Sequence, residues 1–421
     1  MRKSSLATAN QHYLEGRFDK AGAAYRDVIA GEPSNVEALE RLGTIALLQN
    51  ECGEAQHFLE EASRSRPSYR RYWPMTADLD YRIAMTHYRK DEFGAASTRF
   101  RKAAGPLAIG PFRELRALAD HTALLANGPC YVIEGPEEGR VAFLATDPLP
   151  LFEVSVNGHG PLNFFLDTGG AEVILDRDVA TLVGANVCGA MRSDYAGQKT
   201  TATGLGRVDR VNLGGLVVRG VPIHTLDVKS MSAVFDREVH GIIGTRLLMH
   251  FLSTIDYVNG ALVLRRRDAP DAGHAALSRA PDAVAVIPFW LAEMHCMLAW
   301  GSVNDSEPML FFVDTGLAGA AFTASEAVLQ RAGIAIDWST ATPGVGGAGA
   351  TRSVNFVVDR LALGVEDNSV VEAQLPGVAI QGSVSILEGK LGFRVGGLIS
   401  HQFFRNRSIT LDFGAMKLVV W

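Results

Sequence analysis

The pattern of apolar and polar positions changes its character twice along the 421-residue chain. Residues 1–127 are dominated by Ala, Leu, Glu, Arg and Gln, without the alternation typical of strands, and this composition favours helices. After Pro129, short runs rich in Val, Phe, Leu and Ile alternate with Gly, Asn and Asp turns, as in an all-β domain. An Ala-, Pro- and Asp-rich stretch without periodicity, 268–284, divides this β half. We therefore predict a multidomain chain, with a helical domain (1–127), a β lobe (128–267), a linker (268–284) and a second β lobe (285–421).

The helical segment repeats itself with a period of 34 residues. The positions that recur are Ala21, Tyr25, Val28 and Pro33, which reappear as Ala55, Leu59, Ala62 and Pro67. Leu42 and Gly43 offer a small, tight contact between two helices of the second unit. A looser third copy contains Ile83, Ala84, Ala96, Phe100 and Ala103, and an insertion around SYRRYWPM precedes it. The stretch FRELRALADHTALLAN, which stops at an Asn-Gly-Pro terminator, is expected to cap the array.

This period and these positions resemble the tetratricopeptide repeat. The resemblance implies stacked helix pairs that bind a peptide or a partner domain. The alternative is a scaffold that only packs against the rest of the chain.

The two β segments are similar to each other in three places, in the same order. VNGHGPLNFFLDTG at 156–169 aligns without gaps onto VNDSEPMLFFVDTG at 303–316. GIIG at 241–244 corresponds to GLIS at 397–400, and FLSTIDYVNGALVL corresponds to FFRNRSITLDFGAMKLVV. We infer that the β half is a tandem duplication, and we call 128–267 lobe 1 and 285–421 lobe 2.

Each copy places an Asp-Thr-Gly sequence directly after an apolar run, at Asp167 and at Asp314. A carboxylate at the end of a buried strand is costly unless it is paired or hydrogen-bonded. The following glycine lets the chain turn sharply beside the acid, and the threonine offers a hydroxyl that can bond to the other lobe. These supporting residues are Thr168, Gly169, Thr315 and Gly316.

The set of motifs resembles the aspartic proteases of the pepsin and retropepsin clan, over roughly 130–421, with lobe lengths closer to the bacterial retropepsin-like type. The resemblance implies an all-β bilobal fold in which each lobe donates one acid, so that Asp167 and Asp314 form the catalytic pair. Two adjacent carboxyls share a proton and titrate together. The implied reaction is hydrolysis of a peptide bond by an activated water, with no cofactor, no metal and no covalent intermediate.

The family also covers its substrate with a β-hairpin, and each lobe contains a Gly-rich candidate for this flap. In lobe 1 the candidate residues are Tyr195, Gly204 and Gly206, with the two glycines expected near the turn. In lobe 2 they are Gly346 and Gly347. Glycine-rich tips suit a lid that must open, and plain surface hairpins are the alternative.

Three departures from the family pattern leave other functions open. The first is the residue after Asp-Thr-Gly, which is Gly170 in lobe 1 and Leu317 in lobe 2 where the family has Ala or Ser. The second is Ser400 in place of a glycine. The third is the flap tyrosine of the pepsins, for which Tyr195 is the one candidate counterpart. The same fold could carry out acid–base chemistry on a small metabolite, such as isomerisation, elimination or cyclisation. It could also be a non-catalytic pseudoprotease that binds protein ligands.

Net charge and composition restrict the classes of partner that we expect for this chain. The net charge is −6 without a basic stripe, which argues against nucleic acid. No apolar run reaches about 18 residues, so we expect no membrane span. The start, MRKSSLATAN, lacks the apolar region of a signal peptide, and a cytoplasmic location is expected. The four scattered cysteines suggest neither a disulfide framework nor a zinc site. The expected partners are a peptide or protein substrate, or a small metabolite, and a protein bound by the helical repeats.

Overall fold

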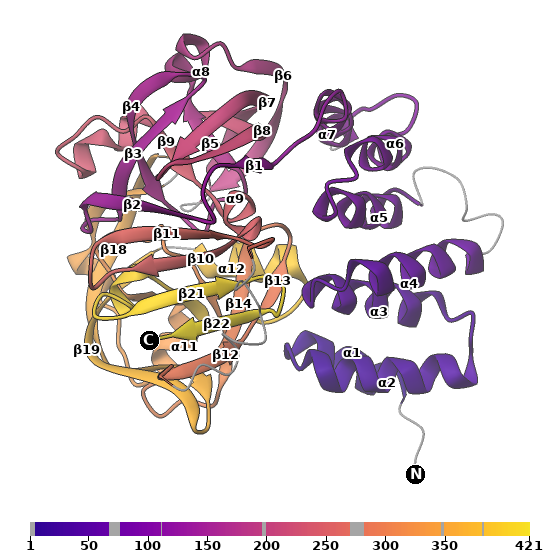
Figure 1. Ribbon diagram of the computed structural model, residues 1–421. Coiled ribbons are helices and arrows are strands. Elements are labelled where there is room, and N and C mark those ends of the chain that lie inside the picture. Colours follow the sequence, from indigo (N-terminus) through magenta and orange to yellow (C-terminus); the bar gives the residue numbers. More distant parts are fainter. Residues whose placement is uncertain are drawn as a thin grey trace.

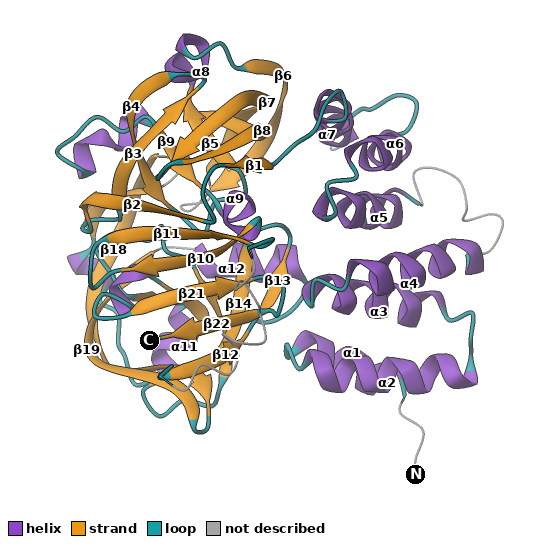
Figure 2. Cartoon of the chain, viewed as in Figure 1, coloured by secondary structure: helices purple, strands orange, loops and turns teal. Residues whose placement is uncertain are grey.

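The computed structural model describes residues 5–66, 76–110, 112–195, 199–269, 282–346, 349–380 and 383–421. A column of helices stands beside a large β-rich region (Figures 1 and 2). The helices of this column, which we call the helical array, are α1 (Leu6–Leu14), α2 (Phe18–Gly31), α3 (Val36–Leu48), α4 (Cys52–Ser65), α5 (Ala77–Arg89), α6 (Phe93–Ala104) and α7 (Phe112–Leu125). The predicted helical segment and the predicted β half are both confirmed.

Small residues bring the paired helices of the array close together. A Cβ atom added to Gly43 would lie 2.6 Å from Leu59 Cγ, so α3 and α4 touch where the sequence predicted a tight contact. Ala55 and Leu59 in the second unit, like Phe100 in the third, have no exposed surface. The insertion SYRRYWPM and Pro67 before it lie outside the described residues.

Lobe 1 is a strongly paired β domain with two short helices. Its elements are β1 (Val132–Glu134), β2 (Glu138–Ala145), β3 (Leu151–Val156), β4 (His159–Leu166), β5 (Val173–Asp176), α8 (Arg177–Leu182), β6 (Asn186–Tyr195), β7 (Lys199–Leu213), β8 (Leu216–Leu226), β9 (Gly241–Ile243), α9 (Thr245–Met249), β10 (Phe251–Asp256) and β11 (Ala261–Arg266). Strand β4 pairs in parallel with β9, and β5 pairs in parallel with β8.

Lobe 2 has a matching set of pairings. Its elements are β12 (Ala285–Pro288), β13 (Trp290–Ala292), β14 (Cys296–Val303), β15 (Met309–Val313), β16 (Phe322–Thr323), α11 (Glu326–Arg331), β17 (Thr342–Gly346), β18 (Gly349–Val365), β19 (Asn368–Ile380), α12 (Ser383–Leu391), β20 (Gly397–Ile399), β21 (Ser408–Asp412) and β22 (Lys417–Val420). Strand β15 pairs in parallel with β20, and β16 with β19. The pairings follow the same pattern as in lobe 1, and the tandem duplication stays an inference from the sequence.

A shared sheet joins the lobes. Strands β12, β22 and β21 of lobe 2 continue through the β10–β21 pair into β10, β11 and β2 of lobe 1. The hydroxyls of Thr254 and Thr410 lie 2.8 Å apart across this junction. The closing strands of the two lobes therefore belong to one continuous sheet.

The helical array contacts both lobes. Its first helices place Tyr13 and Phe18 against Trp290 and Phe393 of lobe 2, with ring centroids 4.9–5.9 Å apart. Its last helix, α7, packs on β6 and β7 of lobe 1, where His121 Nε2 lies 2.9 Å from the carbonyl oxygen of Gly206. The array thus serves, at these surfaces, as a scaffold for the β half.

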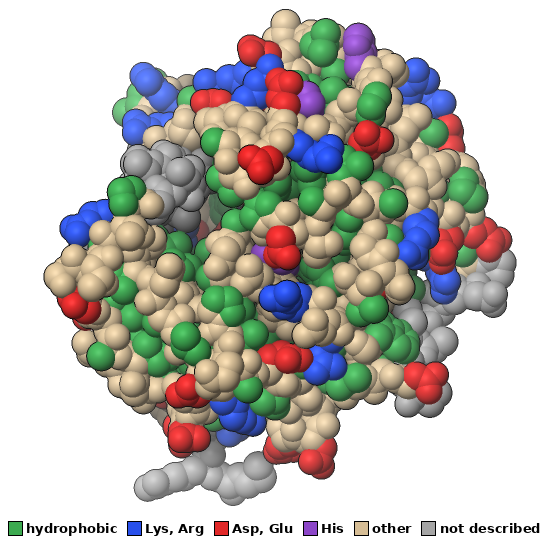
Figure 3. All heavy atoms as spheres, turned by 90° about the vertical axis from the view of Figure 1, so that its left-hand side faces the viewer, with side chains coloured by type: hydrophobic (Ala, Val, Ile, Leu, Met, Phe, Trp, Pro, Cys, Tyr) green, Lys and Arg blue, Asp and Glu red, His purple; other side chains and the backbone are tan. Residues whose placement is uncertain are grey.

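Charged side chains of both signs are interspersed over the face shown in Figure 3, among apolar and uncharged ones. None of the described helices is long and apolar enough to cross a membrane.

Candidate active site

The two Asp-Thr-Gly loops begin where two short parallel strand pairs end. Leu166, the last residue of β4, pairs with Ile243 of β9, and the backbone N–H of Asp167 donates to the carbonyl of Ile243. In lobe 2, Val313 pairs with Ile399, and the N–H of Asp314 donates to that carbonyl. Each acid is therefore fixed at the end of a buried strand by the same local geometry.

The threonines connect the two loops, as the sequence predicted. The backbone N–H of Thr168 donates to Thr315 Oγ1 at 2.9 Å, and the N–H of Thr315 donates to Thr168 Oγ1 at 3.0 Å. The Thr168 hydroxyl in turn donates to the carbonyl of Val313 at 3.0 Å. Both threonines have no exposed surface. This reciprocal grip holds the two loops together inside one chain.

The glycines bring each loop against the opposite acid. The N–H of Gly169 donates to Asp167 Oδ1 at 2.7 Å, and the N–H of Gly316 donates to Asp314 Oδ1 at 2.9 Å. A Cβ atom on Gly169 would lie 2.4 Å from Asp314 Oδ1, and one on Gly316 would lie 2.2 Å from Asp167 Oδ1. Only glycine fits at these two positions, because any side chain would push the opposite carboxyl away.

The two carboxyls lie close to each other, because Gly169 donates to Asp167 and its α-carbon faces the carboxyl of Asp314. Burial raises the pKa of Asp167 above its ordinary value. Burial and the negative charge of Asp167 raise the pKa of Asp314 further, well above its ordinary value. Perturbed acids of this kind are typical of functional sites. The arrangement can hold one proton between two oxygens and so offers an acid and a base together.

The elements behind the two loops differ. In lobe 1 the Thr245 hydroxyl donates to the carbonyl of Thr168 at 2.8 Å, and the backbone N–H groups of Thr245 and Arg246 donate to Gly170 and Ala171. Sequence reasoning missed these residues. The signal for them was the lone arginine that follows GIIG in an otherwise apolar stretch.

In lobe 2 the loop is backed by the serine that departs from the family pattern. Ser400 Oγ donates to the carbonyl of Leu317 at 2.5 Å and lies 3.1 Å from His401 Nδ1. His401 Nε2 is 3.4 Å from Asp147 Oδ1 of lobe 1. The two departures at 317 and 400 are therefore in contact, and the serine hydroxyl holds the backbone after Leu317.

The expected place of Gly204 and Gly206 near a turn was wrong. Gly204 pairs with Ala190 and Thr225, and Gly206 pairs with Val187, well inside β7. A Cβ atom on Gly204 would lie 2.2 Å from Thr225 Oγ1, so this glycine permits close packing between strands. The carbonyl oxygen of Gly206 also forms a hydrogen bond with His121 Nε2 of α7.

In each lobe the two strands of the candidate flap stay paired as far as the described residues reach. In lobe 1, Tyr195 pairs with Lys199 at the end of β6, and its side chain lies outside the described part of the structure. In lobe 2, Gly346 pairs with Gly349 at the end of β17, whereas Gly347 is outside the described residues. The role of these residues in a flap stays a prediction.

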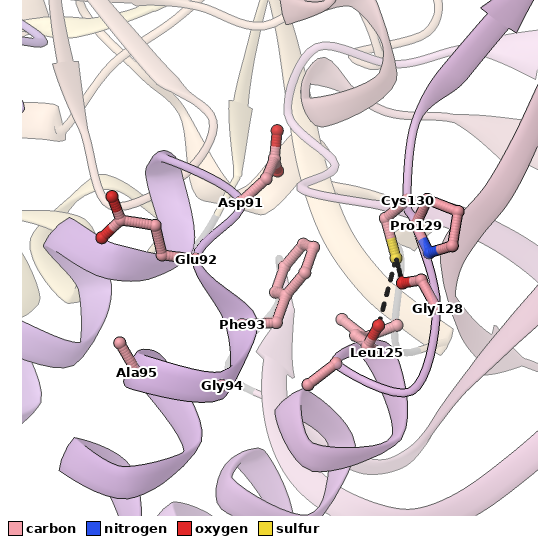
Figure 4. Close-up of a pocket in the computed structure, with 10 residues that line it drawn as sticks. Asp91, Glu92, Phe93, Gly94, Ala95, Leu125, Gly128, Pro129 and Cys130 are labelled. Carbon is pink, nitrogen blue, oxygen red and sulfur yellow. Dashed lines mark hydrogen bonds between the residues drawn. The ribbon is translucent and has the colours of Figure 1, made fainter.

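A pocket of about 440 Å³ lies elsewhere, between the start of α6, the end of α7 and residues 128–130 (Figure 4). The Cys130 thiol donates to the carbonyls of Leu125 and Gly128 in its wall, and burial raises the pKa of this thiol to about 11. No residue of either Asp-Thr-Gly loop lines this pocket, so it is separate from the carboxyl pair. Within the described ranges, no three His, Cys, Asp or Glu side chains group as metal ligands.

Comparison with protein families agrees with this geometry. Residues 152–247 match the family model described as aspartyl protease, and residues 12–79 match the one described as tetratricopeptide repeat. The chain therefore contains an aspartyl protease domain, which includes the Asp167 loop, and an N-terminal tetratricopeptide repeat.

No curated protein matches the chain. Among the solved structures that do match is Basic 7S globulin from soybean, at 10% identity and a TM-score of 0.38, covering 69% of this chain and 94% of that one. A structural similarity at this TM-score supports no conclusion about function.

Proposed function

We propose that this protein is an aspartic endopeptidase whose catalytic pair is Asp167 of lobe 1 and Asp314 of lobe 2. The observation that carries the proposal is the approach of the two acids, each against the glycine of the opposite loop, held by the reciprocal threonine grip between the loops. The aspartyl protease family match over 152–247 supports the same reaction class.

The two acids share one proton at rest. Burial raises the pKa of both carboxyls, and the charge of Asp167 raises that of Asp314 further. Each acid also accepts one backbone N–H, from Gly169 or from Gly316, so either acid can be the ionised member.

This shared proton gives a reaction without a covalent intermediate. The ionised acid takes a proton from a bound water as the water oxygen attacks the carbonyl carbon, and the protonated acid gives its proton to the carbonyl oxygen. When the tetrahedral intermediate collapses, the C–N bond breaks, the first acid passes its proton to the leaving amine, and the second acid recovers a proton from the hydroxyl of the intermediate. The products are a carboxylic acid and an amine, and the pair returns to its starting state.

The role of the helical array in docking a substrate or partner stays a prediction. Arg89 donates to the carbonyls of Leu291 at 2.7 Å and of Glu293, and Tyr81 donates to Glu293 Oε2 at 3.2 Å. These side chains are engaged within the chain, so a partner would have to use other surfaces of the array.

The test is hydrolysis of a peptide library by the purified full-length chain, with and without a statine-type transition-state analogue. Such an analogue places a hydroxyl between the two acids, where the attacking water would lie. We expect cleavage that the analogue blocks, with kcat/KM rising as the pair loses its first proton and falling as it loses its second. Absence of cleavage from about pH 3 to about pH 8, together with turnover of a small metabolite, would favour the acid–base alternative. Absence of both would favour a pseudoprotease.

A further inference from the structure

We propose that the helical array positions the Asp167 loop through a buried polar cluster, so that Tyr88 and Asp91 of the array are positioning residues for catalysis. This inference rests on the proposed function. The cluster consists of Tyr88 and Asp91, from the end of α5 and the turn after it, and Tyr131, Glu172 and Arg246 of lobe 1.

Glu172 is the centre of the cluster and lies five residues after Asp167. Its side chain is only 2% exposed, yet both carboxylate oxygens have a partner. The Tyr88 hydroxyl donates to Oε1 at 2.7 Å, and the Tyr131 hydroxyl donates to Oε2 at 2.9 Å. One of the two donors therefore comes from the helical array and the other from lobe 1 itself.

Arg246 makes the second connection. Its side chain is almost completely buried and forms an ion pair with Asp91. The guanidinium also donates to the carbonyl of Tyr88 at 2.9 Å and lies 5.6 Å and 5.5 Å above the rings of Tyr88 and Tyr131. A buried arginine is costly without partners, and the array supplies several of them.

Both Glu172 and Arg246 connect the array to the loop that carries Asp167. Glu172 belongs to the chain segment between the loop and β5. The N–H groups of Thr245 and Arg246 donate to the carbonyls of Gly170 and Ala171. The turn at Tyr88–Asp91 thus contacts Glu172 directly and, through Arg246, holds the backbone of Ala171, so the array reaches the loop within five residues of Asp167.

Lobe 2 has no such connection at its matching position. Five residues after Asp314 the chain has Gly319, which is exposed and has a positive φ of 77°. Its loop is held instead by Ser400. The array therefore acts on one acid of the pair, and a small shift of that acid changes the distance between the two carboxyls. Misplacement of a reacting group by a fraction of an ångström reduces kcat more than substrate binding.

The chain offers a matched pair of substitutions on one helix. Tyr88→Phe and Tyr81→Phe each remove one hydroxyl of α5 that donates to a glutamate of the β half, Glu172 in the first case and Glu293 in the second. We expect Tyr88→Phe to lower kcat roughly tenfold with KM unchanged, the effect of one hydrogen bond to a charged group. Tyr81→Phe should leave both constants unchanged.

Hydrogen–deuterium exchange of the same variants gives a readout that does not depend on activity. In Tyr88→Phe, amides in 168–176 should exchange faster than in the wild type, while amides in 315–323 should not change. Unchanged exchange and unchanged kcat in Tyr88→Phe would overturn the proposal, as would equal effects in Tyr81→Phe. If the wild-type chain cleaves no peptide, the proposed function fails, and the exchange comparison alone decides whether the array positions this loop.

Discussion

The Asp167 loop of lobe 1 and the Asp314 loop of lobe 2 share their inner contacts and differ in what lies behind them. Inside, the same threonine, glycine and carboxyl geometry occurs twice, with hydrogen bonds that differ by no more than 0.2 Å. Behind the first loop lie Arg246 and the helical array, and behind the second lies Ser400. The inner contacts are the same because a pair of catalytic acids requires them. The contacts behind the loops can differ because they only have to keep each loop in place.

The attachments of the array to the two lobes also differ. Its contact with lobe 2 combines aromatic rings, among them Phe18 and Trp290, with the buried Arg89, which donates to the carbonyls of Leu291 and Glu293. Its contact with lobe 1 contains the buried His121 and Arg246. The contact with lobe 1 should therefore respond to acid pH through His121, and the predictions below compare what holds each lobe and each loop.

The largest effect is expected from Arg246→Met. Removing this cation leaves Asp91 without its ion-pair partner and several carbonyls without a donor, so we expect a loss of about 3–5 kcal/mol in the free energy of unfolding. Gln402→Met, at the matching position of lobe 2, is the control and should change it by less than about 0.5 kcal/mol. Chemical denaturation measures both, and similar losses in the two variants would show that lobe 1 is not specially held.

The next effect is the dependence of stability on pH at the contact between α7 and lobe 1. Burial lowers the pKa of His121 from 6.5 to about 4. Between pH 6.5 and about pH 4, His121 is therefore protonated in the unfolded chain and neutral in the folded chain. Protonation favours the unfolded state in this range, so the free energy of unfolding falls as the pH falls. The loss is about 3 kcal/mol. Denaturation of His121→Gln should show a flatter pH dependence over this range, and an unchanged slope would contradict the assignment.

The N–H bonds of the threonine grip should contribute alike in both lobes. Thr168→Val removes the acceptor of the Thr315 N–H and also the hydroxyl that donates to the carbonyl of Val313. Thr315→Val removes the acceptor of the Thr168 N–H, and both changes alter the volume little. Each leaves a buried donor unsatisfied and should cost about 2 kcal/mol. Thermal unfolding of the two variants measures this, and a large cost in only one of them would break the symmetry of the inner contacts.

The smallest effect is expected at Ser400. Ser400→Ala removes the hydrogen bond to the carbonyl of Leu317 and should cost about 1 kcal/mol. Ser400→Gly, which restores the residue typical of the family, is the matched comparison, because it also removes the hydroxyl. If neither variant changes stability or kcat, the serine does not hold the second loop.

The acids and their supporting residues could be predicted because the chain states the same motif twice. An apolar run followed by Asp-Thr-Gly in two aligned copies indicates both the pairing and the roles of Thr168, Gly169, Thr315 and Gly316. The structure adds the reason for the glycines, which is the closeness of the opposite carboxyl.

The outer contacts could not be predicted in the same way. Tyr88 and Glu172 are 84 residues apart and belong to different domains, and no local pattern connects them. Gly204 and Gly206 were placed near a turn because glycine is common in turns. In the structure they lie within paired strands, where the neighbouring strand leaves no room for a side chain.

A double-mutant cycle on the two acids tests the central claim most directly. We expect Asp167→Asn and Asp314→Asn each to lower kcat for peptide hydrolysis on the order of 10³-fold, with melting temperatures close to that of the wild type. Because the two carboxyls act as one unit, the double variant should be no less active than either single variant. Wild-type kcat in either single variant would contradict a shared catalytic centre.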